Sequence, residues 1–210
     1  MSNYQLLSTR QLLAGEKYSK ASCLKNHKFF EYICYMSEYR KANVEGATYF
    51  VTLTVVGWID VFTREIYTQE IIKNLQFCQK NKGLEVFAYV IMSNHIHLVA
   101  RRKEGLLSNV LRDFKSYTSK QILKLIEENP SESRKEWLLY MFKYFAKFKN
   151  QDYMFWQHNN HPIELVSANV TLQKINYIHE NPVRAGIVSE AQNYIYSSAN
   201  QFSPLKCIMP

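Results

Sequence analysis

The chain has 210 residues, enough for one sizeable domain with its own core but not for two full domains. Hydrophobic residues make up 47% of the sequence and aromatic residues 14%, which excludes a disordered chain. The net charge of +8 favours a polyanionic partner, and nucleic acid is favoured over a membrane because no basic amphipathic anchor or lipidation motif is found. A basic protein without such a partner is the alternative.

An N-terminal stretch precedes the first element whose pattern can be interpreted. Residues 1–35 show no clean period, so we expect an extension of unknown role before a domain that spans residues 36–202. Residues 203–210 are expected to form a C-terminal tail. Within the domain, alternating β-branched and aromatic residues predict a strand over Thr48–Val56. Apolar residues at helical spacing then predict a helix over Ile66–Lys82, which the following glycine ends.

Two further strands are predicted next, over Glu85–Ile91 and His95–Arg102. The three residues that join them are few enough to make the strands antiparallel neighbours. A long helix over Leu106–Glu128 follows and stops before Pro130. This order of elements predicts an α+β fold, a ferredoxin-like or RRM-like split β-α-β antiparallel sheet with helices on one face. The other face of the sheet is then open to a ligand.

The remaining elements combine aromatic and basic residues. A helix over Arg134–Asn150 carries aromatic residues that we expect mainly in the core, and Lys143 and Lys147 between them could follow a phosphate backbone. A solvated helix face is the alternative explanation for these charges. An extended segment and turn over Phe155–Leu165 lead to a last helix over Ala168–Asn181, which the next residue, a proline, is expected to end.

Two histidines lie two residues apart on the third predicted strand. Because alternate strand residues project from the same face, His95 and His97 should present two imidazoles side by side while Ile96 and Leu98 enter the core. Imidazole suits divalent transition metals and tolerates Mg²⁺ or Mn²⁺ when oxygen ligands complete the shell. The pair is therefore half of a metal site, and a polar patch on a half-buried strand is the other interpretation.

The last helix offers oxygen atoms that could complete this site. Tyr177 and Asn181 are four residues apart, so they share one helical face. Taken together, the segments Ser93-Asn94-His95-Ile96-His97-Leu98, Phe155-Trp156-Gln157 and Tyr177–Gly186 resemble the single-tyrosine HUH transposases and, within them, the REP-associated tyrosine transposase branch. The three motifs occur in the family's order, and the resemblance runs from about Met36 to Phe202.

The resemblance implies roles for particular residues. His95 and His97 would bind a divalent cation, Mg²⁺ or Mn²⁺, and Tyr177 would be the nucleophile. Related enzymes often place an amide ligand, frequently glutamine, four residues after the tyrosine, where this chain has Asn181, shorter by one methylene. Substitutes for this third ligand lie on other faces of the helix and are less favoured: His179 and Glu180.

The reaction implied by the resemblance is that of a DNA transposase, a single-strand DNA endonuclease and strand transferase. Tyr177 would attack single-stranded DNA beside a hairpin or repeat, form a 5′-phosphotyrosine link and release a 3′-hydroxyl. Tyr117 is the second candidate for the nucleophile. DNA backbone contacts are expected from basic residues that could equally form an exposed surface: Arg112, Lys115, Lys120, Lys143, Lys147 and Arg184. The sequence leaves open whether a homodimer exchanges the tyrosine helix.

Other classes of protein fit the sequence less well. A non-catalytic or domesticated nucleic-acid-binding protein of the same fold is the main alternative, although the chain lacks the aromatic strand motif of RNA-recognition domains. A two-histidine phosphoesterase needs His-x-Thr/Ser motifs, and none of the 6 histidines is followed two residues later by threonine or serine.

The cysteines indicate the kind of cellular compartment in which the protein is expected. Cys23, Cys34, Cys78 and Cys207 show neither C-x-x-C spacing nor a clear pairing, which makes a zinc site improbable. Without a signal peptide or a run of 18 apolar residues, the sequence predicts free thiols in a reducing compartment, the cytoplasm, and no membrane partner.

Overall fold

The computed structural model describes residues 42–147 and 151–208 of the chain. All of them belong to one compact unit, Ser37–Pro210. The expectation of an extension over residues 1–35 lies outside the described residues. No helix in the described part is long and apolar enough to cross a membrane.

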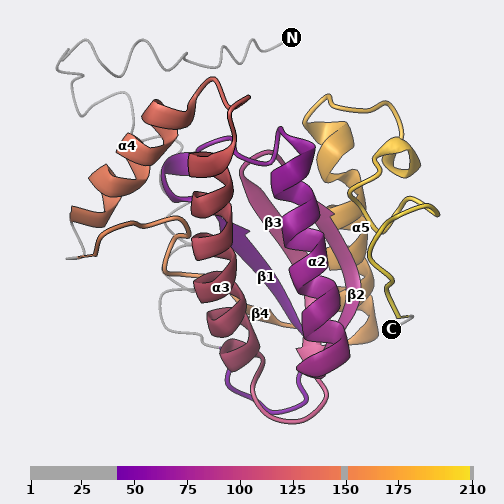
Figure 1. The fold of residues 1–210 in the computed structure, drawn as a ribbon. Helices are drawn as coiled ribbons and strands as arrows, with labels where there is room; N and C mark the ends of the chain where they lie inside the picture. Colours follow the sequence, from indigo (N-terminus) through magenta and orange to yellow (C-terminus); the bar gives the residue numbers. More distant parts are fainter. Residues whose placement is uncertain (1–41, 148–150, 209–210) are drawn as a thin grey trace, which may run out of the picture. The chain divides into compact units, whose positions relative to one another are not determined.

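A four-stranded antiparallel sheet forms the centre of this unit (Figure 1). Its strands are β1 (Tyr49–Thr54), β2 (Leu84–Ile91), β3 (His95–Arg102) and β4 (Ile163–Glu164), in the spatial order β2-β3-β1-β4. The predicted hairpin of β2 and β3 is confirmed, with Ile91 opposite Ile96. β3 therefore lies between two partners, and its middle residues are buried because both sheet faces are covered at this point.

Two helices cover one face of the sheet, α2 (Glu65–Asn81) and α3 (Leu107–Glu128). Figure 1 shows them side by side in front of β1, β2 and β3. The larger hydrophobic core lies between them and the sheet and contains Ile96 and Leu98, as the alternation of β3 predicts. The predicted split β-α-β arrangement with helices on this face is thus confirmed.

The opposite face of the sheet was predicted to be open, but a helix covers part of it. Helix α5 (Ala168–Arg184) packs on it across β2 and β3, because Ile175 and Ile178 project from one side of α5 into a second apolar cluster with Val90 and Val99. The split β-α-β arrangement predicted helices on one face alone, and the helix that covers the other face comes from the distant end of the chain. The histidine pair therefore lies on a face that a helix partly covers.

Helix α5 also continues past the residue that was expected to end it. Pro182 lies inside the helix, which runs to Arg184. The helix then closes with a Schellman motif, in which Gly186 N–H donates to Val183 O at 2.9 Å and Ile187 N–H donates to Pro182 O at 2.9 Å. Proline is tolerated here because it stands in the last turn and its carbonyl receives a capping hydrogen bond.

Helix α4 (Lys135–Lys147) packs against α3. Fewer of its aromatic side chains are buried than predicted. Only one stripe of α4 is buried, Leu138, Phe142 and Ala146, because these residues recur every four positions. The large aromatic residues on the other faces are exposed, contrary to the expectation that most would enter the core: Trp137, Tyr140 and Tyr144.

Among the described residues, two short 3₁₀ turns and the last residues of the chain complete the fold. The turns are η2 (Val56–Trp58), directly after β1, and η3 (Ala191–Asn193). Residues 203–208 pack against the domain, since Leu205 is buried and Ile208 N–H donates to Val86 O at 2.9 Å. Cys78 and Cys207, the described cysteines, are both free thiols.

Candidate active site

Strand β3 presents His95 and His97 on the face that α5 covers. The ring centroids of the two histidines are 4.7 Å apart, and the planes meet at 71°. Opposite them on β1 stand Thr54 and Thr52, which pair with His95 and His97 respectively. The predicted side-by-side placement is therefore present, and the neighbouring strand supplies the polar surroundings of the pair.

Each imidazole uses its Nδ1 atom within the protein. His97 Nδ1 lies 2.9 Å from Thr52 Oγ1, and His95 Nδ1 lies 2.8 Å from Asn94 Oδ1. Because these contacts fix the ring orientations, they favour Nε2 as the metal-binding atom of both rings. Within the described residues no hydrogen bond to either Nε2 atom is formed.

Both histidines are neutral at physiological pH. Burial lowers the pKa of His95 to about 4, although the nearby Asp60 carboxylate acts in the opposite direction. Burial, together with the charges of His95 and Lys174, lowers the pKa of His97 to about 3. Neutral imidazole is the form that binds a metal, so the pair does not have to lose protons to do so.

Tyr177 stands beside this pair. The apolar side of α5 is fixed on the sheet by Ile175 and Ile178, and the tyrosine on the same helix places its ring centroid 5.4 Å from that of His97. It also contacts Phe50 edge-on at 5.8 Å. About 36% of the residue is exposed, so a substrate can reach it. One chain thus brings the predicted nucleophile and the histidine pair together.

Two cations lie over the tyrosine ring. Lys174 Nζ is 5.8 Å from the ring centroid of Tyr177, and the guanidinium carbon of Arg184 is 5.3 Å from it. Arg184 was expected to contact DNA, and the structure places it at the tyrosine. Sequence reasoning missed Lys174, although its position one turn before Tyr177 on the same helix was a usable signal.

The third metal ligand remains a prediction. Asn181 is half-buried one helical turn after Tyr177, whereas His179 is turned elsewhere, with its Nε2 atom 2.9 Å from Ser198 Oγ. In the described part of the chain, no group of three or more His, Cys, Asp or Glu side chains is arranged to hold a metal ion. Two neutral imidazoles would hold only part of the coordination shell of a divalent cation, and oxygen ligands would have to complete it.

Tyr117, the competing tyrosine, belongs to another part of the molecule. It lies on α3, which packs on the sheet face opposite α5, and it lines a cavity of about 600 Å³ between α2 and α3 together with Phe77 and Lys120. The histidines project from the other face. The geometry therefore favours Tyr177 over Tyr117 as the nucleophile.

The remaining basic residues proposed for DNA contacts are distributed over α3 and α4. Lys115 is half-buried, and its ammonium donates to Gln157 O at 2.5 Å, His158 O at 3.2 Å and Asn160 Oδ1 at 2.7 Å. It therefore supports the 157–160 segment, and burial lowers its pKa to about 8. The other four side chains are exposed: Arg112, Lys120, Lys143 and Lys147. Of these, Arg112 forms an ion pair with Asp113.

Asn94 connects the histidine pair to the loop after β1. Besides contacting His95, its amide nitrogen donates to Asp60 Oδ1 at 2.9 Å and to Trp58 O at 3.2 Å. The Trp58 ring in turn contacts the His95 ring edge-on at 5.7 Å. Sequence reasoning included Asn94 in a motif but gave no role to Trp58 or Asp60, because only the folded loop brings them to His95.

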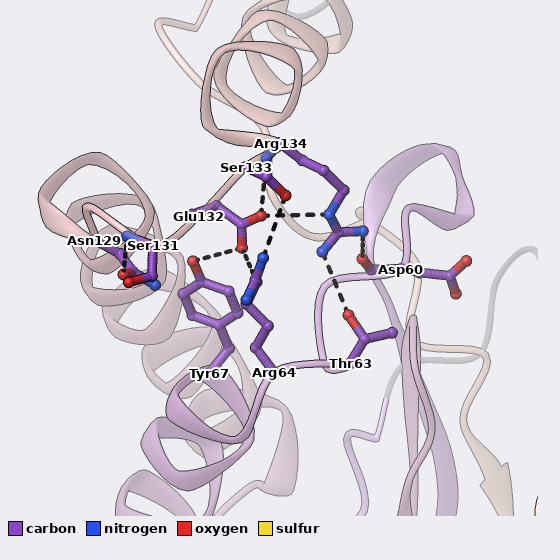
Figure 2. A network of polar contacts seen from close by, with 9 residues as sticks. All are labelled: Asp60, Thr63, Arg64, Tyr67, Asn129, Ser131, Glu132, Ser133 and Arg134. Atoms are coloured by element: carbon purple, nitrogen blue, oxygen red, sulfur yellow. Dashed lines mark hydrogen bonds and ion pairs between the residues drawn. The ribbon is translucent and has the colours of Figure 1, made fainter.

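A polar network holds the other end of this loop (Figure 2). Buried Glu132 forms an ion pair with Arg64 at 2.7 Å and accepts a hydrogen bond from the Tyr67 hydroxyl at 3.1 Å. Arg134 contacts the same carboxylate and donates to the backbone carbonyl of Asp60 at 2.9 Å. The Asp60 carboxylate points away from Arg134 in Figure 2 and pairs instead with Asn94. The α3–α4 connection thus fixes the loop that supports His95.

An antiparallel sheet with two neutral histidines on one face and a helical tyrosine beside them defines a class of domains with a two-histidine, single-tyrosine centre. The model of one family, described as "Transposase IS200 like", matches residues 43–181 of the chain. Because this match covers more than half of the 210 residues, the chain belongs to the IS200-like transposase family.

A solved structure shows the same fold. The structure of a REP-associated tyrosine transposase bound to a REP hairpin aligns with a TM-score of 0.54 and 18% sequence identity, covering 83% of this chain and 100% of that chain. At this identity the likeness establishes the fold alone. A comparison with curated proteins found no match.

Proposed function

We propose that this IS200-like transposase cleaves and rejoins single-stranded DNA through a covalent link to Tyr177, assisted by a divalent metal at His95 and His97. The observation that carries the proposal is the 5.4 Å separation between the Tyr177 and His97 rings within one chain. A hairpin or repeat beside the cleavage site is the proposed recognition element, supported by the hairpin bound to the structural neighbour and by the resemblance to the REP-associated branch.

Each side chain has a defined part in the proposed reaction. The Tyr177 oxygen attacks a backbone phosphorus, the new Oη–P bond forms, and the P–O3′ bond breaks. Tyr177 loses its hydroxyl proton to solvent, and the departing 3′ oxygen takes up one. Attack by a 3′-hydroxyl on the phosphotyrosine reverses these steps and rejoins a strand without ATP.

The surroundings of Tyr177 suit a negatively charged substrate. Lys174 and Arg184 lie over its ring and would attract the phosphate to it. Mg²⁺ or Mn²⁺, held by His95 and His97 with Asn181 as the proposed third ligand, would when bound withdraw charge from the non-bridging phosphate oxygens. A phenol is a weak nucleophile at neutral pH, and the negative phosphate oxygens repel an incoming phenolate. Withdrawing charge from these oxygens therefore assists the attack.

A denaturing-gel assay tests the proposal directly. Wild type, Tyr177→Phe and Tyr117→Phe are incubated with labelled single-stranded hairpin oligonucleotides in Mn²⁺, in Mg²⁺ or in EDTA. We expect a covalent protein–DNA band for wild type and Tyr117→Phe that needs metal and is absent for Tyr177→Phe. A band that persists in Tyr177→Phe and disappears in Tyr117→Phe would transfer the role to Tyr117.

The histidines are tested in the same assay. His95→Gln and His97→Gln should each abolish the covalent band while single-stranded DNA binding, measured by fluorescence anisotropy, stays close to wild type. Equal loss of binding would make the pair a structural element. Tight binding by wild type with no band on any hairpin oligonucleotide would instead favour a non-catalytic DNA-binding relative.

A further inference from the structure

Trp58 is a large exposed side chain next to the proposed metal site. It lies in the η2 turn, 58% of its surface is exposed, and its ring is 5.7 Å from the His95 ring. The contacts of Trp58 with His95, of His95 with His97 and of His97 with Tyr177 form a continuous series of rings. Trp58 thus stands at the His95 end of this series, and Tyr177 stands at the other.

The backbone of Trp58 adopts a conformation that bulky residues rarely accept. Its φ of 56° is in the left-handed region, as is that of Gly57, at 64°. Such strain costs on the order of 1–3 kcal/mol and persists only where the surrounding structure imposes it. A tryptophan kept exposed and strained beside a reactive centre therefore calls for a role other than packing.

The surrounding structure does impose this conformation. A Cβ atom at Gly57 would lie 2.6 Å from the Phe145 ring of α4, so α4 leaves room only for glycine at that position. Trp58 N–H donates to Val55 O at 3.1 Å, and Trp58 O accepts from the Asn94 amide at 3.2 Å. Asn94 also contacts His95 Nδ1, so one side chain sets the position of Trp58 relative to the histidine.

We propose that Trp58 is a stacking platform for an unpaired base of the DNA strand that is cleaved. This inference rests on the function proposed above and names a binding residue for that substrate. Unpaired bases bind proteins by stacking on exposed aromatic rings, and indole offers a large face for this contact. A base held at Trp58 would fix the strand at the His95 end of the ring series while a phosphate of the same strand lies at Tyr177.

The proposal is tested by a double-mutant cycle that combines a substitution at Trp58 with the removal of one base from the DNA. Binding is measured by fluorescence anisotropy with hairpin oligonucleotides carrying a single-stranded flank, in which an abasic site is moved along the flank one position at a time. Trp58→Gly removes the ring and suits the left-handed backbone, and Trp58→Asn, which also tolerates it, is the second variant. Trp137→Ala, at an exposed tryptophan on α4, is the matched control.

We expect Trp58→Gly and Trp58→Asn to bind the intact oligonucleotide roughly 5- to 100-fold more weakly than wild type, and Trp137→Ala to bind normally. In wild type, one abasic position should weaken binding by a similar factor, and at that position the Trp58 variants should lose nothing further. Unchanged binding by the folded Trp58 variants, or losses that multiply at every abasic position, would overturn the proposal.

The outcome is separable from that of the proposed cleavage. All of these affinities are measured in a Tyr177→Phe background, which serves as the wild-type reference for Trp58, because no covalent link to residue 177 can form there. One outcome is an abasic position at which the Trp58 variants lose no further affinity, while the protein with Tyr177 forms no covalent band. This outcome would support stacking and overturn cleavage. A metal-dependent band with unchanged affinity in the Trp58 variants would support cleavage and overturn stacking.

Discussion

The hydrogen bond between Thr52 and His97 is the residue-scale feature that most directly prepares the proposed metal site. His97 is buried and its Nδ1 atom contacts Thr52 Oγ1 at 2.9 Å, which orients Nε2. Partners of this kind typically contribute about 10- to 100-fold to metal affinity.

Replacing Thr52 by valine removes this hydrogen bond while keeping the shape of the side chain. We expect Mn²⁺ affinity, measured by isothermal titration calorimetry, to fall about tenfold or more with little change in the circular dichroism spectrum. Thr54→Val is the matched control, because Thr54 is on the same strand and its hydroxyl makes no hydrogen bond to either histidine in the described residues. Equal losses in both variants would contradict a specific role for Thr52.

Burial of neutral histidines also makes the metal-free protein sensitive to acid. The pKa of His95 is about 4 in the folded state, against about 6.5 in an unfolded chain. The unfolded state therefore binds more protons between these values, so stability is fully present above about pH 6.5 and is lost as pH falls toward 4.

We predict that, when the pH falls from 7 to 5, the protonation of His95 alone lowers the unfolding free energy of the metal-free protein by about 2 kcal/mol. Urea unfolding in EDTA at both pH values, for wild type and His95→Gln, measures this as the difference between their pH-dependent losses. The variant should lose less stability than wild type. Parallel losses in the two proteins would show that His95 is not buried in its neutral form.

At the scale of elements, the η2 turn depends on its contact with α4. Gly57 and Gly186 both have φ values above 60°, but a Cβ atom would meet the Phe145 ring at Gly57 and nothing within 4 Å at Gly186. The two glycines therefore separate the cost of an unfavourable backbone angle from the cost of a clash.

Gly186→Ala should destabilise the protein by about 1 kcal/mol, the usual cost of a non-glycine residue in this conformation. Gly57→Ala should cost clearly more, because the Phe145 ring must also move. In a Phe145→Ala background the additional cost should disappear, leaving Gly57→Ala close to Gly186→Ala. Thermal and urea unfolding measure the four variants and wild type, and an unchanged cost of Gly57→Ala in the Phe145→Ala background would refute the contact.

The elements themselves were largely predictable from the sequence. Apolar periodicity gave α2 and α3 within one residue, and alternation with a short connection gave the hairpin of β2 and β3. Pro182 was misleading, because a proline in the last helical turn removes only one donor and the Schellman motif uses its carbonyl. The last helix was expected near the histidines, but the apolar packing by which α5 covers this face was missed, because it depends on segments far apart in the sequence.

The candidate site was predictable in part. Alternation placed His95 and His97 on one face, and the resemblance pointed to Tyr177, which lies beside them. Thr52 could not be assigned, because its contact depends on the register of β1 against β3. Trp58 and Asp60 come to His95 through a loop with left-handed backbone angles, for which local sequence offers only Gly57 as a sign.

At the scale of the whole molecule, the larger core and the proposed active site of the described unit lie on opposite faces of its sheet. The face under α2 and α3 carries the larger core, and the face under α5 carries the histidine pair, the tyrosine and the two nearby cations. Basic residues of α3 and α4 lie away from the tyrosine. A hairpin that contacts them while its single-stranded flank enters the site would have to extend over more than one face.

The same arrangement predicts that one protomer is sufficient for catalysis. Tyr177 and His97 approach each other within a single chain, and the apolar contacts of Ile175 and Ile178 hold the tyrosine helix on its own sheet. A helix exchanged between two copies would have to give up those contacts and form them again on the partner. We therefore expect the tyrosine to act with the histidines of its own chain.

Mixing two inactive variants tests this expectation. Tyr177→Phe is combined with a size-tagged His95→Gln/His97→Gln double variant, under refolding conditions that allow chains to exchange, and the hairpin oligonucleotide is added with Mn²⁺. If the tyrosine acts within its own chain, the mixture forms no covalent band, whereas wild type treated in the same way does. A band at the size of the tagged chain would mean that its intact tyrosine had entered a partner's histidine site. Exchange would then be favoured over the packing of α5 on its own sheet, and the active form would be a dimer.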